Sequence, residues 1–457
     1  MGAAVSERDF DVIIVGAGIA GSTAALVAAR AGLSTVVLER GEKPGAKNLS
    51  GGVLFSPVIN RLIPNFWEEA PVERPVVKRK YAFLSRERSL VVEFASEKFA
   101  EPPYNNNFTV LRSKFDEWLA GKAEEAGAEI YSGIVVDDVI WEGEGEERRV
   151  IGIKARSEEG HDEITAHVVI IAEGANSFLP ERMGIRPMWG PNDYVTTAKE
   201  IVRLDPEKIE ERFGLGPGEG CAIEYLGLPG STMMGGGFIY TNRETLSVGI
   251  GVLIGDLMKE RITPYNLLEM FKSHPHVAPL LADSEVIEYS AKMIPEVGLD
   301  KMPKLYGNGF MVVGDAAGFV NNSLYHEGTN FASASGMYAA ETAAEAKEKG
   351  DFSARALASY REKLEGSFVL KDLRRFGEVA DFIHSHPELI STYPETFMEM
   401  IEHYFSVSED PKEENITRMI GTFKSRVQLF RFLMDSYKAH TKVLGFSPTA
   451  FLTGKGK

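Results

Sequence analysis

The stretch Asp11-Val-Ile-Ile-Val-Gly-Ala-Gly-Ile-Ala-Gly21 decides the fold of this chain. An apolar run, of the kind that forms a buried strand, leads directly into three glycines with the spacing Gly-x-Gly-x-x-Gly, and an alanine-rich helical segment follows. In this pattern Gly16 permits a tight turn, Gly18 lets a pyrophosphate approach the backbone, and Gly21 lets the helix pack against the strand. The stretch therefore predicts the first half of a dinucleotide-binding βαβ unit.

The residues that follow complete the unit. Ile19 and Ala20 open the helix, where free N–H groups and the positive end of the helix dipole favour phosphate. A second apolar strand, residues 35–38, ends at Glu39, with Arg40 beside it. Glu39 occupies the position where an acidic side chain accepts hydrogen bonds from an adenosine ribose. This order of elements favours a bound dinucleotide over a purely structural glycine turn, but it leaves FAD and NAD(P) both open.

Composition excludes several classes of protein. The 457-residue chain is 44% hydrophobic and 25% charged, as in globular proteins with substantial cores. Its net charge of −16 argues against nucleic acid as a partner. We identify no signal peptide and no apolar run of the about 18 residues that a membrane span needs, so we expect a cytoplasmic protein. The single cysteine, Cys221, cannot supply the four thiolates of an iron–sulfur cluster, and we expect it to be an ordinary buried thiol.

Two later segments help to decide between the cofactors. Residues 166–176 form an apolar strand and a glycine turn, and residues 310–318 form another strand that ends at Gly314-Asp315. The Asp315 carboxylate can meet the ribityl hydroxyls of a flavin. A helix begins near residues 328–330, and its N–H groups can face the flavin pyrimidine, where negative charge builds up on reduction. These segments, in this order, favour FAD.

Together the segments, over roughly residues 9–350, resemble the glutathione-reductase-type flavoprotein fold in its p-hydroxybenzoate-hydroxylase-like branch. The resemblance implies an α/β protein whose FAD-binding Rossmann domain carries an inserted β-rich quinone/substrate domain and a helical C-terminal extension. It also implies a role for Arg112, because the family uses an arginine at a helix start near the FAD phosphates. One motif departs from the family pattern, since Glu173-Gly174 stands where Asp-Gly is usual. The domain limits that we expect are 1–80, 105–190 and 305–350 for FAD binding, 81–104 and 191–304 for the β-rich domain, and 351–457 for the helical region.

Further stretches narrow the family. The glycine-rich segment 44–52 resembles the flavin-side loop of the electron-transfer-flavoprotein:quinone oxidoreductases, and residues 235–240 resemble a strand of their quinone-side domain. Residues 314–318 and 327–330 fit their third flavin motif. With its length and helical C-terminal region, the chain most resembles the short FixC-type (EtfC) members, which lack the fused iron–sulfur domain. The residues expected to contact FAD are Gly16, Gly18, Ile19, Ala20, Gly21, Glu39, Arg40, Lys47, Ser50, Gly51, Gly52, Arg112, Val136, Ala172, Glu173, Gly174, Gly314, Asp315, Gly328, Thr329 and Asn330.

The resemblance implies an electron-transferring enzyme. Electrons would leave the alpha and beta subunits of an electron transfer flavoprotein, pass through this FAD and reduce a membrane quinone, either menaquinone or ubiquinone. A small ferredoxin-like iron–sulfur subunit (FixX or EtfX type) would be a further partner, and some such assemblies bifurcate electrons. We identify no catalytic acid or base from the sequence. The histidine pairs 274/276 and 384/386 lack the spacing of a metal site, so we expect solvated histidines and no metal.

Residues 416–442 combine an apolar stripe with local positive charge. The spacing of the stripe predicts one amphipathic helix. Such a helix can lie at an anionic membrane surface, bind a partner subunit or pack into its own core. Because a quinone lies in the bilayer, we expect the protein to be peripheral at the inner face of the cell membrane. The apolar positions are Ile416, Ile420, Phe423, Val427, Phe430, Met434 and Tyr437, and the basic ones are Arg418, Lys424, Arg426, Arg431, Lys438 and Lys442.

Three other functions stay open at this point. A geranylgeranyl-reductase-type enzyme, which reduces isoprenoid double bonds, shares the fold, but that family typically carries a Tyr-x-Trp-x-Phe-Pro signature. The comparable strand here reads Gly-Gly-Gly-Phe-Ile-Tyr. A flavin monooxygenase would need a route for NAD(P)H and a small aromatic pocket. A non-enzymatic assembly subunit would hold FAD only for the stability of the fold.

Overall fold

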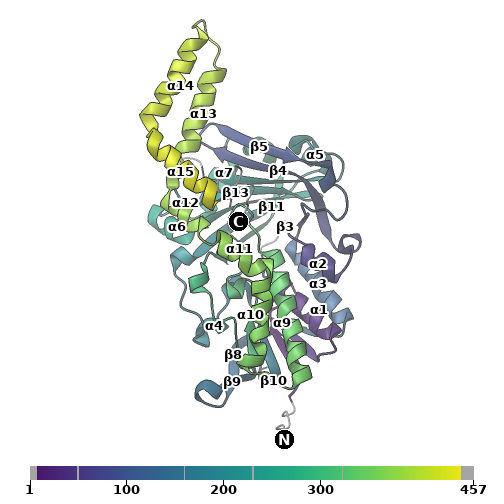
Figure 1. Ribbon diagram of the computed structural model, residues 1–457. Helices are drawn as coiled ribbons and strands as arrows, with labels where there is room; N and C mark the ends of the chain where they lie inside the picture. Colours follow the sequence, from purple (N-terminus) through teal and green to yellow (C-terminus); the bar gives the residue numbers. More distant parts are fainter. Residues whose placement is uncertain (1–7, 49–50, 159, 229–230, 322, 444–457) are drawn as a thin grey trace.

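Two β-sheets and a set of C-terminal helices make up the fold (Figure 1). The computed structural model describes residues 8–48, 51–158, 160–228, 231–321 and 323–443. The sheets are joined by segments that cross between them more than once, so each lobe is built from discontinuous parts of the chain. This arrangement confirms the predicted α/β class with a sheet-rich second lobe and a helical C-terminal region.

The first sheet is the nucleotide-binding sheet that the N-terminal stretch predicts. Strand β1 pairs in parallel with β2 and β10, and β10 pairs in parallel with β17. Val12, Ile13 and Ile14 of β1 are fully buried, as expected of a parallel strand covered on both faces. The strands, in spatial order, are β16 (Tyr306–Gly307), β17 (Phe310–Val312), β10 (Gly160–Ile171), β1 (Phe10–Val15), β2 (Thr35–Glu39) and β7 (Glu129–Ser132), while β8 (Val135–Glu142) and β9 (Arg149–Ser157) extend from the first half of β10.

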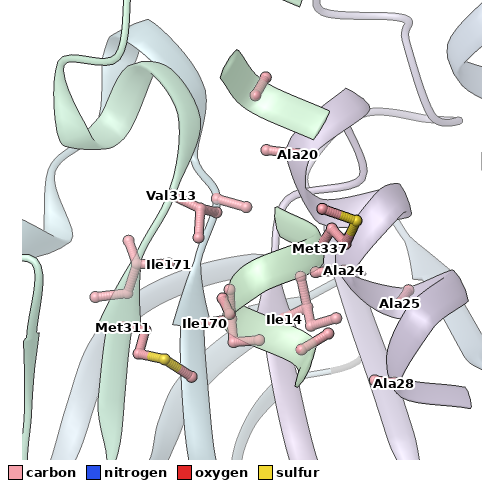
Figure 2. Packing of buried hydrophobic residues seen from close by; sticks show 14 of the residues in the cluster. Ile14, Ala20, Ala24, Ala25, Ala28, Ile170, Ile171, Met311, Val313 and Met337 are labelled. Carbon is pink, nitrogen blue, oxygen red and sulfur yellow. The ribbon is translucent and has the colours of Figure 1, made fainter. Parts of the chain in front are cut away.

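Helices α1 (Ile19–Arg30) and α9 (Thr329–Lys349) pack closely in the main core. A Cβ atom at Gly336 of α9 would lie 2.2 Å from the Ala20 carbonyl oxygen, so only glycine allows this approach. Figure 2 shows the alanines of α1 and Met337 of α9 in one buried cluster with the strand residues. Helix α3 (Arg112–Glu125) starts at Arg112, the arginine expected at a helix start, and it buries Phe115, Leu119 and Ala123. This packing fixes the start of α1 relative to the sheet.

The second sheet has its own core. Strands β12 and β4 run parallel and the other neighbours along the sheet pair antiparallel. Cys221 of β12 is fully buried, which confirms the expected ordinary thiol, and burial raises its pKa to about 12. The strands, in spatial order, are β15 (Glu285–Pro295), β11 (Tyr194–Arg203), β14 (Thr245–Leu253), β13 (Gly235–Thr241), β12 (Gly220–Leu226), β4 (Val72–Leu84), β6 (Phe108–Val110) and β3 (Gly52–Leu54), with β5 (Ser89–Ala95) beside β4.

The expected β-rich domain over residues 191–304 also contains several helices. Residues 193–287 contain α5 (Pro206–Phe213), α6 (Ile254–Glu260), α7 (Pro264–Lys272) and α8 (Ala278–Leu281). Helix α7 begins at a recognisable cap, because the Thr263 hydroxyl accepts a hydrogen bond from the Asn266 N–H at 3.2 Å and proline follows at the first helical position. His274, expected to be solvated, is buried instead, and its Nε2 lies 2.8 Å from the Ser85 carbonyl oxygen. Helix α7 packs against the second sheet, so His274, which follows the helix directly, is buried there as well.

Strand β3 already belongs to the second sheet, and α2 (Pro57–Leu62) lies between β3 and β4 of that sheet. The domain limits therefore remain a proposal, and the second sheet takes its first strand from within the range 1–80 that we expected for FAD binding.

The C-terminal helices divide into two groups. Helices α10 (Ala354–Gly366) and α11 (Phe368–Phe376) complete the main core. After α12 (Val379–Ser385), helices α13 (Thr392–Phe405) and α14 (Lys412–Arg426) form a hairpin that projects from the body, at the end far from the N-terminus (Figure 1). Within the described residues, no helix is both long enough and apolar enough to cross a bilayer.

The predicted single helix over residues 416–442 is wrong. Helix α14 ends at Arg426, and α15 (Leu429–Lys442) begins after two residues in extended conformation. Phe423 is half-buried and Val427 is buried, whereas Ile416, Ile420 and Phe430 are exposed. The apolar spacing continues across the break, so it could not reveal that the chain changes direction there.

Candidate active site

A cavity of about 870 Å³ lies between the two sheets. Its wall includes the glycine turn after β1, the end of β2, the start of α9 and residues of strands β11, β13 and β15. Sites for small ligands and cofactors have volumes of roughly 300–1,000 Å³, so this cavity is at the large end of the range. It can hold a ligand of dinucleotide size.

The glycine turn forms a cradle at one end of the cavity. Gly16 has a φ of +103°, and a Cβ atom there would lie 2.5 Å from the Ala172 carbonyl oxygen. Gly18 lies on the cavity wall, and a Cβ atom there would have only Asn48 Nδ2 within 4 Å, at 3.7 Å. A side chain at position 18 would therefore grow into the cavity. The bare backbone and the start of α1 leave this space to a pyrophosphate.

Glu39 is held rigidly at the end of β2. Its Oε2 accepts a hydrogen bond from the Ala17 N–H at 2.9 Å, and its Oε1 accepts one from the Gly41 N–H at 2.7 Å. The side chain is buried and lines the cavity. Each carboxylate oxygen can accept a second hydrogen bond, so Glu39 can also receive the hydroxyls of a ribose.

Charged side chains gather where the two lobes meet. Arg112 binds the buried Asp116 carboxylate through two hydrogen bonds, of 2.7 and 2.8 Å. Burial alone would lower the pKa of Arg112, but Asp116 outweighs it and raises this pKa. Burial raises the pKa of Asp315, while Lys292 and Arg112 act against it. The cations of this group suit a pyrophosphate, and Asp315 faces the same space from the end of β17.

The start of α9 also faces the cavity. Gly328 is the N-cap of this 21-residue helix, and both Gly328 and Thr329 line the wall. The Thr329 hydroxyl accepts a hydrogen bond from the Phe55 N–H at 2.9 Å, which ties the helix start to the segment after β3. The positive end of the helix dipole is thus directed at the ligand space, where it would stabilise negative charge.

Most of the sequence-predicted residues come together on this wall. Gly21 lies behind it, where a Cβ atom would be 1.9 Å from the Gly16 carbonyl oxygen. Gly314 and Asn330 also stand outside the wall, and Ser50 lies outside the described residues. The predicted residues that line the cavity are Gly16, Gly18, Ile19, Ala20, Glu39, Arg40, Lys47, Gly51, Gly52, Arg112, Val136, Ala172, Glu173, Gly174, Asp315, Gly328 and Thr329.

Glu173, which departs from the family motif, has a local structural task. Its Oε2 accepts hydrogen bonds from the Ser177 hydroxyl at 2.8 Å and from the Leu179 N–H at 3.0 Å, at the start of α4 (Leu179–Arg182). The longer side chain therefore stabilises the turn after β10 while the backbone at Gly174 stays open to the cavity.

Sequence reasoning missed Lys199 of β11. This lysine is fully buried, its Nζ donates to the Gly51 carbonyl oxygen, and it lies 5.9 Å from the centre of the Phe238 ring. Burial, together with the nearby Arg112, lowers the pKa of Lys199 to about 7. A lysine within a strand ordinarily indicates the solvent face of a sheet, so no local pattern marked it as part of a site.

A second missed group lies on the far side of the cavity. Glu224 of β12 pairs with His326 at 3.0 Å and with Arg79 at 3.4 Å. Glu296, directly after β15, is another titratable residue on the wall. The aromatic rings of Phe238 and Tyr240 stack with their centres 4.9 Å apart, and both rings belong to residues that line the cavity.

Comparison with known protein families matches three parts of the chain. Residues 11–176 match the family described as FAD dependent oxidoreductase. Residues 194–294 match the ubiquinone-binding family of ETF-QO, and residues 379–444 match the C-terminal domain of the ETF-QO/FixC family. The first match contains the glycine turn and Glu39, and the second contains the strands β11, β13 and β14.

Curated relatives cover almost the whole chain. The Escherichia coli strain K12 protein named "Probable electron transfer flavoprotein-quinone oxidoreductase YdiS" is 39% identical over 96% of this chain and 100% of its own length. Protein FixC of Bradyrhizobium diazoefficiens is 39% identical over 94% of this chain and 98% of its own length.

Solved structures share the fold. A geranylgeranyl bacteriochlorophyll reductase-like protein from Thermoplasma acidophilum aligns with a TM-score of 0.67 and 26% identity, over 91% of this chain and 98% of that one. A flavin-dependent brominase aligns with a TM-score of 0.62 and 18% identity, over 94% of this chain and 99% of that one. With the cradle at Gly18, the Glu39 carboxylate and the α9 start in place, the residues fit FAD. The chain belongs to the family of FixC and the electron transfer flavoprotein-quinone oxidoreductases, and it is a FAD-dependent oxidoreductase.

Proposed function

We propose that this protein passes electrons from an electron transfer flavoprotein, through its own FAD, to a membrane quinone. The observation that carries the proposal is the continuity of the cavity, which reaches from the glycine turn at Gly18 to the glycine-rich strand β13. Strand β13 lies in the region that matches the ubiquinone-binding family. A flavin ring and a quinone ring can therefore share one enclosed space, which short-range electron transfer requires.

The residues of the chain would bind and orient the two reactants. FAD, when bound, supplies the redox chemistry. The backbone at Gly18 and the start of α1 would hold its pyrophosphate, with Arg112 nearby. The start of α9 would stabilise negative charge on the flavin ring. Phe238 and Tyr240 would exclude water from the quinone side.

We place the entrance for the quinone beside the C-terminal helices. Ile383 of α12 and Ile390, which precedes α13, line the cavity. The adjoining helices carry exposed apolar side chains, which we call the C-terminal apolar surface. A chain that meets a bilayer-dissolved substrate needs such a surface near its entrance. The residues of this surface are Tyr404, Phe405, Val407, Ile416, Ile420, Leu429, Phe430, Leu433, Met434 and Tyr437.

Helix α15 supports this placement most directly. Leu429, Leu433 and Tyr437 recur every four residues, with Phe430 and Met434 beside them, and all five are exposed. Phe432, on another face of the helix, packs edge-on against the Tyr393 ring of α13 with ring centres 5.1 Å apart. One face of α15 therefore anchors it to α13, and the other is free to lie on the inner face of the cell membrane.

The basic side chains of this region contribute less to membrane attraction than their number indicates. Arg426 pairs with Glu399 at 2.6 Å, and Lys442 pairs with Glu378 at 2.9 Å. Arg418 pairs with Asp410 at 2.7 Å, and Arg431 also pairs with a carboxylate. Because these charges are locally balanced, we expect apolar insertion to dominate over attraction to anionic lipid.

The proposal includes protein partners. The alpha and beta subunits of an electron transfer flavoprotein would deliver electrons, and a small ferredoxin-like subunit of the FixX or EtfX type would supply the iron–sulfur cluster, since this chain has one cysteine. In an assembly that bifurcates electrons from NADH, the bifurcating flavin would lie in the electron transfer flavoprotein.

The isoprenoid-reducing alternative is not favoured. The second lobe matches the ubiquinone-binding family, and the curated relatives over the whole chain are FixC proteins and a quinone oxidoreductase. The reductase-like structure from Thermoplasma acidophilum shares the architecture at 26% identity.

Anaerobic affinity purification of the tagged protein from its native host, with identification of subunits and assays of flavin and iron, tests the proposal. We expect two electron transfer flavoprotein subunits, a small iron–sulfur protein and FAD. The purified assembly should then reduce decylubiquinone or menadione when its flavin is reduced through the partner. A lone FAD protein whose flavin is not reduced by any electron transfer flavoprotein would overturn the proposal.

A further inference from the structure

The ion pair between His326 and Glu224 lies on the cavity wall, and it joins the residue directly before the third flavin motif to strand β12 of the second sheet. The Nδ1 of His326 lies 3.0 Å from Glu224 Oε2, and Arg79 binds the other carboxylate oxygen at 3.4 Å. Glu224 is buried, whereas 47% of the His326 side chain is exposed and this residue lines the cavity. The imidazole is thus held at one nitrogen and is open to a ligand at its other side.

The loop that carries His326 is closed by several hydrogen bonds. Residues Asn321 and Glu327 pair through their backbones at 2.8 and 3.1 Å, and the His326 N–H donates to the Ser323 carbonyl oxygen at 3.0 Å. The Tyr81 hydroxyl donates to the Leu324 carbonyl oxygen at 2.9 Å. His326 itself has a φ of +46°, which a residue with a Cβ atom rarely adopts. A strained conformation fixed by this many contacts is typical of a functional position.

Glu296 connects this group with a second, smaller cavity. It lines the main cavity together with His326, and it also lines a neighbouring cavity of about 40 Å³. Asp381 of α12, an exposed residue, also lines that second cavity. Each water needs roughly 10–15 Å³ of such volume, so the second cavity has room for about three waters. Glu296 therefore borders a space outside the main cavity that is large enough for water.

The charges around His326 favour its protonated form. Burial by itself lowers the pKa of an imidazole, but Glu224 and Glu296 outweigh burial and the opposing charge of Arg79, and they raise the pKa of His326 above its usual 6.5. Burial raises the pKa of Glu296 to about 7, with His326 lowering it and Asp381 raising it. The carboxylates around His326 therefore favour its protonated form, and Glu296 titrates close to neutral pH.

We propose that His326 donates a proton to a carbonyl oxygen of the quinone, that Glu224 is its positioning residue, and that Glu296 resupplies His326 with protons through the second cavity. This inference rests on the proposed function. The quinone takes up two electrons and one proton from reduced FAD and the second proton from His326, so that quinol forms. The neutral imidazole then receives the Glu296 proton, and solvent protonates Glu296 again by way of Asp381.

The test follows the reoxidation of the FAD-loaded protein by rapid mixing. The protein is first photoreduced without oxygen and then mixed with decylubiquinone, with menadione or with ferricenium, which accepts an electron but no proton. His326→Asn keeps the left-handed backbone accessible, because asparagine tolerates positive φ, but its neutral amide is too weak an acid to protonate a quinone. We expect reoxidation by the quinones to slow on the order of 100-fold and reoxidation by ferricenium to stay unchanged. The exposed His161 of β10, which lines neither cavity, provides the matched control, His161→Asn, which should behave as wild type.

The pH profile separates a proton donor from a merely structural residue. The wild-type rate with quinone should fall as the pH rises through the pKa of His326, and the asparagine variant should lose this limb. Glu296→Gln removes one of the carboxylates that raise this pKa, so it should move the limb to lower pH. Histidine NMR titration of wild type and Glu296→Gln, without quinone, measures the same shift directly.

The outcomes separate a failure of the proposed quinone reduction from a failure of the assignment of His326 as proton donor. If ferricenium but neither quinone oxidises the wild-type flavin, the proposed function fails. If quinone oxidises wild type and His326→Asn equally fast, with the same pH profile, only the proton-donor assignment falls. Should the His326 variant lose FAD or melt early, Glu296→Gln and the NMR titration decide, and an unshifted His326 pKa overturns the inference.

Discussion

Lys292 Nζ donates a hydrogen bond to Asn48 Oδ1 at 2.9 Å, which joins the edge strand β15 of the second sheet to the loop after β2 of the first. The Asn48 amide in turn donates to Asp116, the carboxylate that holds Arg112. One hydrogen-bonded chain of side chains therefore runs from the second lobe to the cation expected at the FAD phosphates. This link makes the FAD site dependent on both lobes.

Lys292→Met should weaken FAD binding about tenfold. The substitution removes a hydrogen bond of a charged donor, which contributes about 1.5 kcal/mol, and it removes a cation that keeps the pKa of Asp315 from rising further. Titration of the FAD-free protein with FAD, followed by tryptophan fluorescence, measures the dissociation constant. The exposed Lys304 offers the control Lys304→Met, and equal affinities of the two variants would show that the link does not hold the cofactor.

Gly18→Val should abolish FAD retention in a folded protein. The backbone at Gly18 has φ −75° and ψ −177°, which valine adopts without strain, so the fold should survive. The side chain would instead enter the cavity that the cradle leaves for the pyrophosphate. Absorbance at 450 nm against protein concentration gives the FAD content. Gly121→Ala, in α3 with open space around it, is the matched control; stoichiometric FAD in the valine variant would place the pyrophosphate elsewhere.

Lys199 should make the stability of the FAD-free protein rise with pH. The pKa of this lysine is about 7 in the folded state and near 10.5 in the unfolded chain. Between these values the unfolded state binds more protons, so the free energy of unfolding increases by up to about 1.4 kcal/mol for each pH unit. Urea unfolding at several pH values from 6.5 to about 10 measures this slope. In Lys199→Met the free energy of unfolding should change less with pH, and the variant should be more stable than wild type at pH 6.5. If the free energy of unfolding of both proteins rises equally with pH, the low pKa of Lys199 is refuted.

The C-terminal apolar surface should control binding to lipid vesicles. Phe430→Asp combined with Leu433→Asp replaces two exposed apolar side chains of α15, so the fold should be unaffected while vesicle binding drops at least tenfold. Flotation with vesicles of neutral and of anionic lipid measures this binding. We expect the binding to depend only weakly on salt because neighbouring arginines are paired with carboxylates. Ser425→Asp on α14 serves as the control. Undiminished binding of the double variant would argue for a partner subunit on this surface.

The predicted FAD site rests on short, local patterns. The turn at Gly16 to Gly21, the acid at Glu39 and the junction at Asp315 each follow a strand, and parallel strands place their carboxyl ends at one edge of the sheet. Residues marked by such patterns could therefore be identified without the structure, and most of them line the cavity.

The quinone-side residues could not be identified in this way. Glu224 and His326 are 102 residues apart and come from a strand and an irregular loop, and Glu296 joins them only through the packing of the second sheet. None of them stands in a motif, and each alone resembles an ordinary surface charge. In the C-terminal helices, by contrast, a local pattern was present but misleading. The apolar spacing continues without interruption through Val427, although the chain leaves the helical conformation there, and no glycine or proline marks the break.

The burial of Cys221 has a practical consequence for work on this protein. Its thiol is fully enclosed and its pKa is raised to about 12, so it hardly forms the thiolate that reacts with maleimides or methanethiosulfonates. A single cysteine introduced at an exposed position, such as His384 beside the cavity entrance or Ser425 on α14, would therefore be the one thiol that takes up a fluorophore or a nitroxide. Site-directed labelling therefore does not require the removal of a natural cysteine. Distances measured from such labels could map the position of the protein relative to lipid and to partner subunits.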